Sequence, residues 1–248
     1  MRFPPPFHRG CGMNIQKTIV ITGASSGVGE ELSLRFAGKD WMVCAVARRR
    51  DTLELLHRKY PDRISVFPCN VADVAQVAAT MKAIAEAFGK IDVLVNNAAV
   101  FEMTPFADQD PVRMGEIIDT NLKGVMYCSR FVLPYMIEKA AGMIVNIASV
   151  AGTHGIPLQA AYCASKHGVM GFADALAQEV AAKGIRVATL CPGGIDTPLW
   201  HLGKTHYPGD LSKTMRIEDV GRLVEYIIDQ PEGVLFKQVV FFPTNEWH

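Results

Sequence analysis

Tyr162 and Lys166, which stand four residues apart, are the residues whose types and spacing point most directly to chemistry in this chain of 248 residues. The surrounding segment has a helical pattern, so both side chains lie on one face of a helix. A phenol serves as a base near neutral pH only if its pKa falls from ~10 to ~7, which requires about 4 kcal/mol of preferential phenolate stabilisation. A neighbouring ammonium supplies much of that energy. We therefore expect Tyr162 to exchange a proton with a substrate.

Ser149 comes thirteen residues before the tyrosine, at the end of a strand-like run. Its hydroxyl would bind the reacting oxygen and hold it against the phenol, while a hydride arrives from a nicotinamide on the other side. A tyrosine and a lysine at helical spacing are, taken alone, most often a surface pair. The serine and the glycine pattern described next favour the catalytic interpretation.

Three glycines, Gly23, Gly27 and Gly29, follow a β-branched run directly and lead into a helical one. They let the backbone turn tightly, and they let a diphosphate approach the unpaired N–H groups and the positive dipole end of the helix. A plain tight turn is the alternative. The strand, the spacing and the helix together favour a dinucleotide-binding turn.

The next strand-like run ends at Ala47, where an acidic side chain would bind both ribose hydroxyls of NAD. Arg48, Arg49 and Arg50 follow instead. A guanidinium pairs with a 2′-phosphate in bidentate fashion, and positive charge at a helix N-terminus is otherwise unfavourable. The sequence therefore predicts NADP as cofactor. The alternatives are NAD and three solvated arginines.

Short β-branched runs alternate with longer amphipathic ones along the whole chain, without a repeat of fixed length. This rhythm predicts an α/β fold, with a doubly wound parallel sheet, right-handed crossovers and helices on both faces. Strands are expected at residues 18–22, 42–47, 64–69, 91–96, 143–148, 186–191 and 237–242. Ligands bind beyond the carboxyl ends of such strands, where the residues named above stand.

Several helix ends carry capping signals. Asp73 with Gln76 predicts a capping box before a helix at residues 74–88. Asp110 followed by proline opens a second helix, and Gly184 closes a third at residues 159–183.

The overall charge excludes some classes of partner. The chain carries 25 basic and 25 acidic residues, so no net positive field favours nucleic acid or an anionic membrane. No apolar run approaches the ~18 residues of a membrane-spanning helix. The six cysteines are scattered without a C-x-x-C pair, which predicts buried thiols in a reducing compartment, the cytoplasm by default. His201 and His206 lack metal-ligand spacing, so no metal site is expected.

The chain is predicted to form a single domain, because its 49% apolar side chains suffice for one large core. Met13 stands just before the first strand-like run. Residues 1–12 are therefore expected to be a flexible extension, and residues 13–248 a single dinucleotide-binding catalytic domain.

Taken together, these motifs resemble the short-chain dehydrogenase/reductase family over nearly all of residues 17–242. Further matching segments are Asn96-Asn97-Ala98, Asn121-Leu122-Lys123-Gly124 and Pro192-Gly193-x-x-x-Thr197. The resemblance implies a Rossmann-type domain with a seven-stranded sheet. It also implies a catalytic tetrad of Asn121, Ser149, Tyr162 and Lys166, in which the lysine also holds the nicotinamide ribose and the asparagine positions a water that relays protons to the lysine.

The cofactor-binding residues expected from the motifs and the resemblance are Gly23, Ser25, Ser26, Gly27, Val28, Gly29, Arg48, Arg49, Asn70, Val71, Asn97, Ala98, Tyr162, Lys166, Pro192, Gly193, Ile195 and Thr197. One departure is Ala99, which replaces the glycine usual after Asn-Asn-Ala; its methyl group is tolerable if φ there is below zero.

These observations predict an NADP(H)-dependent oxidoreductase that transfers a hydride between the nicotinamide and a carbonyl or secondary alcohol, with Tyr162 as general acid/base. Aromatic and apolar residues in segment 196–217, where the family has a substrate lid, point to a small uncharged substrate. The alternatives are an NAD-dependent member of the family and a dinucleotide-sensing protein without turnover. In relatives, long helices corresponding to residues 110–139 and 159–183 pack on a two-fold axis, so a homodimer or homotetramer is expected.

Overall fold

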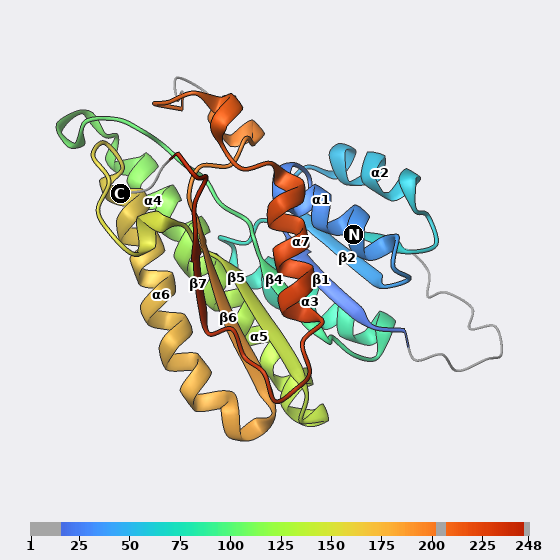
Figure 1. Cartoon of the computed structure of the whole chain (residues 1–248). Coiled ribbons are helices and arrows are strands. Elements are labelled where there is room, and N and C mark those ends of the chain that lie inside the picture. Colours follow the sequence, from blue (N-terminus) through green and yellow to red (C-terminus); the bar gives the residue numbers. More distant parts are fainter. Residues whose placement is uncertain (1–15, 202–206, 246–248) are drawn as a thin grey trace.

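The computed structural model describes residues 16–201 and 207–245, which share one seven-stranded sheet (Figure 1). The strand order is β3-β2-β1-β4-β5-β6-β7, and every neighbouring pair is parallel. The predicted α/β class and doubly wound sheet are therefore confirmed. The expected extension at residues 1–12, together with His206, lies outside the described residues.

The strands are β1 (Thr18–Thr22), β2 (Met42–Ala47), β3 (Ile64–Pro68), β4 (Val93–Asn96), β5 (Gly142–Ile147), β6 (Ile185–Pro192) and β7 (Gln238–Phe241). The α-helices are α1 (Gly27–Ala37), α2 (Arg50–Lys59), α3 (Val74–Phe88), α4 (Pro111–Ile118), α5 (Gly124–Lys139), α6 (Ala160–Val180) and α7 (Ile217–Ile228). Short turns of other helix types lie at η1 (Phe106–Asp108), η2 (Asp119–Lys123), η3 (Val150–Gly152), η4 (Ala181–Lys183), η5 (Pro198–His201) and η6 (Leu211–Lys213).

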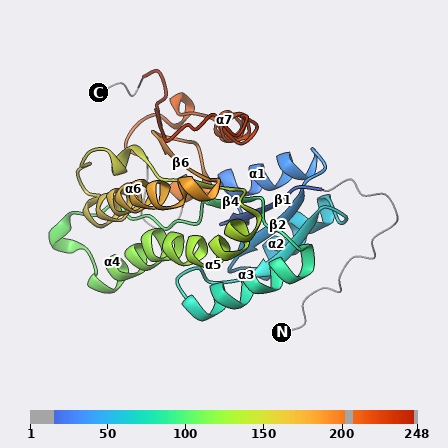
Figure 2. The ribbon, with the colours of Figure 1, turned by 90° about the horizontal axis from the view of Figure 1, so that it is seen from below.

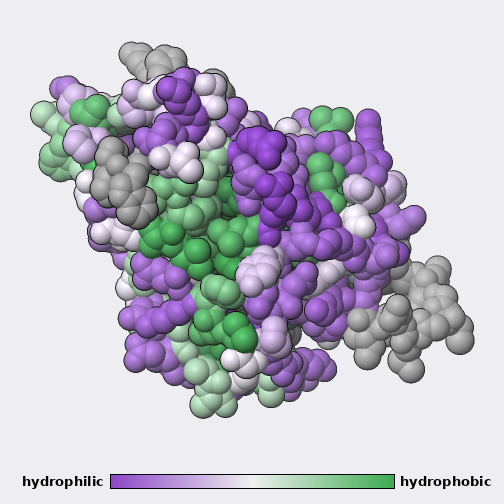
Figure 3. Space-filling view, viewed as in Figure 1, coloured by the Kyte–Doolittle hydropathy of each residue, from purple (hydrophilic) through white to green (hydrophobic). Residues whose placement is uncertain are grey.

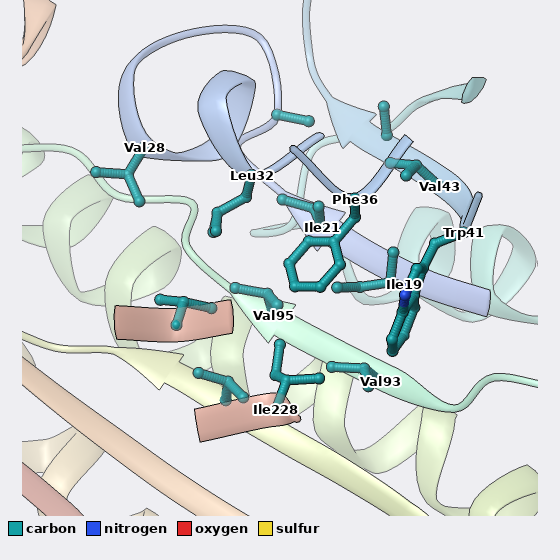
Figure 4. Packing of buried hydrophobic residues seen from close by; sticks show 14 of the residues in the cluster. Ile19, Ile21, Val28, Leu32, Phe36, Trp41, Val43, Val93, Val95 and Ile228 are labelled. Carbon is teal, nitrogen blue, oxygen red and sulfur yellow. The ribbon is translucent and has the colours of Figure 1, made fainter. Parts of the chain in front are cut away.

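The sheet separates two apolar cores, because successive side chains of a strand point to opposite faces. Residues of α1, α2 and α7 pack on one face, and residues of α3, α5 and α6 pack on the other (Figure 2). Ile19 and Ile21 of β1 face the first core, where they meet Phe36 of α1 and Ile228 of α7 (Figure 4). Val20, between them, faces the second core.

The strand order reverses at β1, which pairs with β2 on one side and with β4 on the other. Chain segments that leave β1 and β4 therefore diverge, and a crevice forms between them beyond the carboxyl ends of the strands. This topology decides where a ligand binds, before any side chain is considered.

The two predicted N-caps lie where the sequence indicates. The Asp110 carboxylate accepts the backbone N–H of Val112, and the Asp73 carboxylate accepts those of Ala75 and Gln76. The reciprocal half of the capping box is wrong, however. The Gln76 amide oxygen accepts the N–H of Asn70 at 3.0 Å instead, which fixes the loop after β3.

Residues 110–139, expected as one long helix, are interrupted by the π-helical turn η2 between α4 and α5. Asn121 lies in this turn and is fully buried. Its amide Nδ2 donates to the carbonyl oxygen of Val100 at 2.9 Å, and its Oδ1 accepts the N–H of Val100 at 2.8 Å. π-Helical turns commonly mark functional positions, and here the turn ties the helix to the loop after β4.

Candidate active site

A cavity of about 1030 Å³ lies at the crevice beyond the carboxyl ends of the strands. The predicted site residues that line it are Gly23, Ser25, Ser26, Gly27, Val28, Arg48, Arg49, Asn70, Val71, Asn97, Ala98, Ser149, Tyr162, Lys166, Pro192, Gly193, Ile195 and Thr197. Gly29 and Asn121 are not among the lining residues.

The glycine turn forms one end of the cavity. Gly23 and Gly27 have φ values of 66° and 57°, a region that favours glycine. Ser26, the N-cap residue of α1, makes no side-chain capping bond, so its hydroxyl leaves the first N–H groups of the helix uncapped beside the cavity wall. Uncapped N–H groups at the positive end of a helix dipole fit a diphosphate.

Gly29 has a packing role in the same turn. A Cβ on this residue would lie 2.3 Å from the carbonyl oxygen of Gly23 and 2.6 Å from Nδ2 of Asn97. The Asn97 amide itself donates to the carbonyl oxygens of Thr22 and Gly23, at 3.1 and 3.3 Å. Gly29 therefore allows α1 to approach the ends of β1 and β4 closely.

The wall beside the carboxyl end of β2 carries positive charge. Arg48 and Arg49 line it, and within the described residues neither forms an ion pair; Arg49 donates to the Ser25 hydroxyl at 3.4 Å. Arg50, in contrast, pairs with Glu54 and does not line the cavity. Asp210 is the one carboxylate among the described lining residues. These charges fit an anionic ligand, and the residues present fit a nicotinamide dinucleotide.

Tyr162, Ser149 and Lys166 meet at the centre of the cavity wall. The Ser149 oxygen accepts the N–H of Ala151 at 3.2 Å, and its side chain lies close enough to the Tyr162 phenol to lower the pKa of the phenol by hydrogen bonding. The Lys166 ammonium lies 5.6 Å from the centroid of the Tyr162 ring and donates to the carbonyl oxygen of Ile147 at 2.9 Å. A reacting oxygen placed beside the serine and the phenol would have two hydroxyls within reach.

Burial is the main cause of the pKa shifts of the two titratable groups in this cluster, Tyr162 and Lys166. Desolvation raises the pKa of Tyr162 to about 12, and the hydrogen bond from Ser149 opposes this rise. Desolvation lowers the pKa of Lys166 to about 8. The raised pKa of Tyr162 differs from the sequence-based expectation that a neighbouring ammonium supplies much of the energy needed to make the phenol acidic, because burial outweighs other effects and the ammonium lies over the ring and donates to a backbone carbonyl. At neutral pH the phenol is protonated, which suits it to donate a proton to a carbonyl oxygen.

Asn121 supports this cluster from behind. Besides its two bonds to Val100, its Nδ2 donates to the hydroxyl of Ser165 at 3.1 Å, and that hydroxyl donates to the carbonyl oxygen of Tyr162 at 2.7 Å. Its side chain therefore links η2 to the turn of α6 that carries the tyrosine. Asn121 itself does not line the cavity, although Val100 and Tyr162, which it supports, do.

Comparison with known proteins identifies the family. Residues 17–207 match the family model described as short chain dehydrogenase. The chain belongs to the short-chain dehydrogenase family. All the site residues predicted from the motifs and the resemblance line the same cavity, apart from Gly29 and Asn121.

Curated relatives of this short-chain dehydrogenase include two of different named activities. It is 38% identical over 191 residues to a 3-oxoacyl-[acyl-carrier-protein] reductase of Thermotoga maritima, covering 74% of this chain and 76% of the relative. It is also 38% identical over 181 residues to an NAD(+)-dependent 2-dehydro-3-deoxy-L-rhamnonate dehydrogenase of a Sphingomonas species, covering 73% and 72%.

Among solved structures, the closed form of serine dehydrogenase complexed with NADP+ superposes with a TM-score of 0.86 at 28% identity. The match covers 93% of this chain and 96% of the other. The fold and the dinucleotide-binding architecture of this short-chain dehydrogenase are thus shared with an NADP-bound neighbour.

The structure adds cavity residues that the motifs did not single out. Phe101 follows β4, Arg113 lies on α4, and Trp200 and Tyr207 come from the segment between β6 and α7. Only Trp200 and Tyr207 fell within a segment that the sequence had marked, through its aromatic content. Ala99 also lines the cavity and is absent from the non-glycine residues with positive φ in the described chain, so its methyl group meets the backbone condition.

Proposed function

We propose that this short-chain dehydrogenase is an NADP(H)-dependent oxidoreductase that interconverts a carbonyl and a secondary alcohol on a small uncharged substrate. The observation that carries the proposal is that the Ser149 hydroxyl and the Tyr162 phenol lie together on the wall of a cavity that also contains an uncapped helix N-terminus. The two hydroxyls fit a reacting oxygen, and the helix N-terminus fits the diphosphate of a dinucleotide.

The cofactor, when bound, supplies or accepts the hydride at the reacting carbon. The Ser149 hydroxyl binds the carbonyl oxygen and orients it, and the Tyr162 phenol donates its proton to that oxygen as the carbon is reduced. Lys166 stabilises the phenolate that results, since its ammonium lies over the same ring. In the oxidative direction the same groups act in reverse order.

Tyr162→Phe is the decisive test of the chemistry. We expect turnover of ketones or alcohols to fall by a factor of about 10² to 10⁴, while binding of NADPH, followed by fluorescence titration, changes little. Tyr226→Phe is the matched control, because Tyr226 is an exposed tyrosine of α7 that does not line the cavity. Undiminished turnover in the folded Tyr162 variant would refute the assignment.

The choice of NADP over NAD rests on Arg48 and Arg49. Arg48→Ala should lower kcat/KM for NADPH by about 10- to 100-fold, the value of one charge-assisted bidentate contact, and leave that for NADH nearly unchanged. Arg50→Ala is the control, because Arg50 is paired with Glu54 away from the cavity. An unchanged ratio of the two constants in the Arg48 variant would favour the NAD-dependent alternative.

A dinucleotide sensor without turnover is the rival from another class. It predicts tight NADPH binding but no change in the absorbance of the reduced nicotinamide with any ketone, aldehyde or secondary alcohol. The hydrogen bond between Ser149 and Tyr162 argues against it, since a sensor needs no proton donor beside its cavity.

We also propose that the chain forms a homodimer or homotetramer. Ala160, Ala164, Gly171 and Ala175 are exposed on α6 at spacings that share a face, and a Cβ on Gly171 would meet nothing within 4 Å. Small residues let a second helix approach closely.

Apolar side chains also gather on the face that carries the edge strand β7, where Val240 is 43% exposed (Figure 3). Size-exclusion chromatography with light scattering tests this; a monomer at all concentrations would contradict it.

The expected location in the cytoplasm remains a proposal supported by the thiols. The five cysteines within the described residues are all free and buried, as suits a reducing compartment. No helix in the described part of the chain is long and apolar enough to cross a membrane. The described residues also contain no group of three or more potential metal-ligating side chains.

A further inference from the structure

Four aromatic rings form a continuous row along the substrate end of the cavity. The ring of Tyr162 contacts that of Phe101, with centroids 4.8 Å apart, and Phe101 in turn contacts Trp200 at 4.9 Å. Trp200 contacts Tyr207 at 4.9 Å. All three contacts are edge-to-face, with interplanar angles of 85°, 74° and 75°. All four side chains line the cavity, and we call Phe101, Trp200 and Tyr207 the aromatic wall.

Two of the three rings of the aromatic wall, Trp200 and Phe101, are fixed by contacts with other parts of the chain. The Trp200 indole N–H donates to the carbonyl oxygen of Ile195 at 2.9 Å, which fixes the ring on its own segment. That segment is tied to the chain ahead of α7 by a parallel bridge between Ile195 and Met215. Phe101 is only 7% exposed and packs with buried residues of α4 and α6. A substrate therefore meets rings whose orientations are already set.

The charged groups beside the aromatic wall already have partners. The Arg113 guanidinium pairs with Glu116 at 2.7 Å and donates to the carbonyl oxygen of Phe101 at 3.3 Å. The Asp210 carboxylate accepts the N–H and the hydroxyl of Ser212, at 3.0 and 2.7 Å. The Asp210 carboxylate also pairs with the Lys213 ammonium at 3.9 Å, so both charged groups have an ionic partner and the rings supply the apolar surface of this end of the cavity.

We propose that the aromatic wall selects substrates in which the reacting carbon bears an aromatic ring, that is, aryl ketones and the matching secondary alcohols. An aromatic ring placed against the wall gains an edge-to-face contact in addition to buried area, whereas a saturated ring of the same size gains the area alone. This inference rests on the proposed function and names its substrate class.

The reaction balances with the components already named. The hydride from NADPH forms the new bond to the carbonyl carbon, and the carbon–oxygen π bond breaks. The proton from Tyr162 goes to the oxygen, and the phenol regains a proton from solvent. The products are the aryl secondary alcohol and NADP+.

Two ketones of matched size provide the test: acetophenone and cyclohexyl methyl ketone. The readout is the ratio of their kcat/KM values, compared between wild type and variant so that the intrinsic reactivity of each ketone cancels. Trp200→Leu should lower the ratio by about 3- to 10-fold, the selectivity that an aromatic contact confers. The ring contacts of Trp200 are with Phe101 and Tyr207, and the variant keeps the Tyr162 phenol itself. Trp200→Phe should restore most of the ratio.

Tyr226→Leu is the matched control. Tyr226 also packs edge-to-face on another ring, that of Phe236, at 5.8 Å, but neither residue lines the cavity. Its loss should leave the ratio unchanged. Thermal unfolding of each variant, monitored by circular dichroism, establishes that the protein tested is folded.

The outcomes separate the two proposals. An unchanged ratio in folded Trp200→Leu overturns the role of the aromatic wall and leaves the proposed oxidoreductase intact. Failure of the wild type to turn over any carbonyl or alcohol with either cofactor overturns the proposed function, and the selectivity with it.

Discussion

Lys166→Met is expected to remove catalysis and, at the same time, to change how the stability of the fold depends on pH. Lys166 is buried, with only 3% of its surface exposed, and its ammonium donates a hydrogen bond to the carbonyl oxygen of Ile147 at 2.9 Å. Burial lowers its pKa from 10.5 to about 8. The folded protein therefore holds this charge less readily than the unfolded chain does.

The size of the effect follows from that shift. At about 1.36 kcal/mol per pKa unit, a charged Lys166 destabilises the native state by about 3 kcal/mol below pH 8. Between pH 8 and 10.5 the unfolded chain binds the proton and the native protein does not, so the free energy of unfolding rises with pH in this window. From pH 7 to pH 10 the wild type should gain about 2 to 3 kcal/mol relative to the methionine variant.

Loss of the bond to Ile147 leaves a buried carbonyl without this partner, which costs about 1 to 3 kcal/mol. That cost does not depend on pH. It therefore lowers the free energy of unfolding of the variant by the same amount at every pH, and the slopes of stability against pH still differ between wild type and variant. Tyr162 is present in both proteins, and its pKa of about 12 lies above the range tested.

Urea unfolding at pH 7, 8, 9 and 10 measures the slope, and ketone reduction measures activity. Lys183→Met is the matched control, because Lys183 is an exposed lysine at the end of the same helical segment. The control should follow the wild-type curve. Parallel stability curves for wild type and Lys166→Met would refute the assignment of a destabilised buried ammonium, and normal turnover in the variant would refute its catalytic role.

Three further predictions concern the glycine turn, the Asn121 side chain and the pH dependence of catalysis. Gly29→Ala places a methyl group 2.3 Å from the Gly23 carbonyl oxygen and should destabilise the fold by about 1 to 3 kcal/mol and weaken NADPH binding; thermal unfolding and fluorescence titration measure the two effects. Asn121→Leu leaves the N–H and carbonyl groups of Val100 without their side-chain partners and should cost about 2 to 5 kcal/mol in urea unfolding, so a variant as stable as wild type would contradict the role of this link. The kcat for carbonyl reduction should fall as pH rises through about 8, because Lys166 then loses the proton whose charge stabilises the phenolate; a profile flat to pH 10 would oppose this.

Much of the architecture was predictable because its signals are local. β1 and β2 have the predicted bounds, since β-branched runs bounded by turn residues favour strands at those residues. The predicted helix at 74–88 is α3, because the Asp73 carboxylate accepts N–H groups only two and three residues further on. In the glycine turn, positive φ at Gly23 and Gly27 likewise depends on residue type alone.

Other features depend on contacts between segments far apart in the sequence. The break in the expected helix at 110–139 involves Asn121 and its bonds to Val100, on the loop after β4. The position of the ammonium depends on the Ile147 carbonyl of β5. The four-residue spacing predicted that Tyr162 and Lys166 share one face of a helix. It did not predict their desolvation, which shifts the pKa values of both groups.

The sequence by itself therefore determined the alternation of strands and helices, the glycine-rich turn after β1, and the identity and helical spacing of Tyr162 and Lys166. Only the tertiary structure decided that Phe101 and Trp200 stand beside Tyr162, that the pKa of Tyr162 is raised and not lowered, and that Gly29 and Asn121 act from behind the cavity wall. The reason is physical: backbone preferences act over a few residues, whereas desolvation and ring packing arise only when distant segments meet.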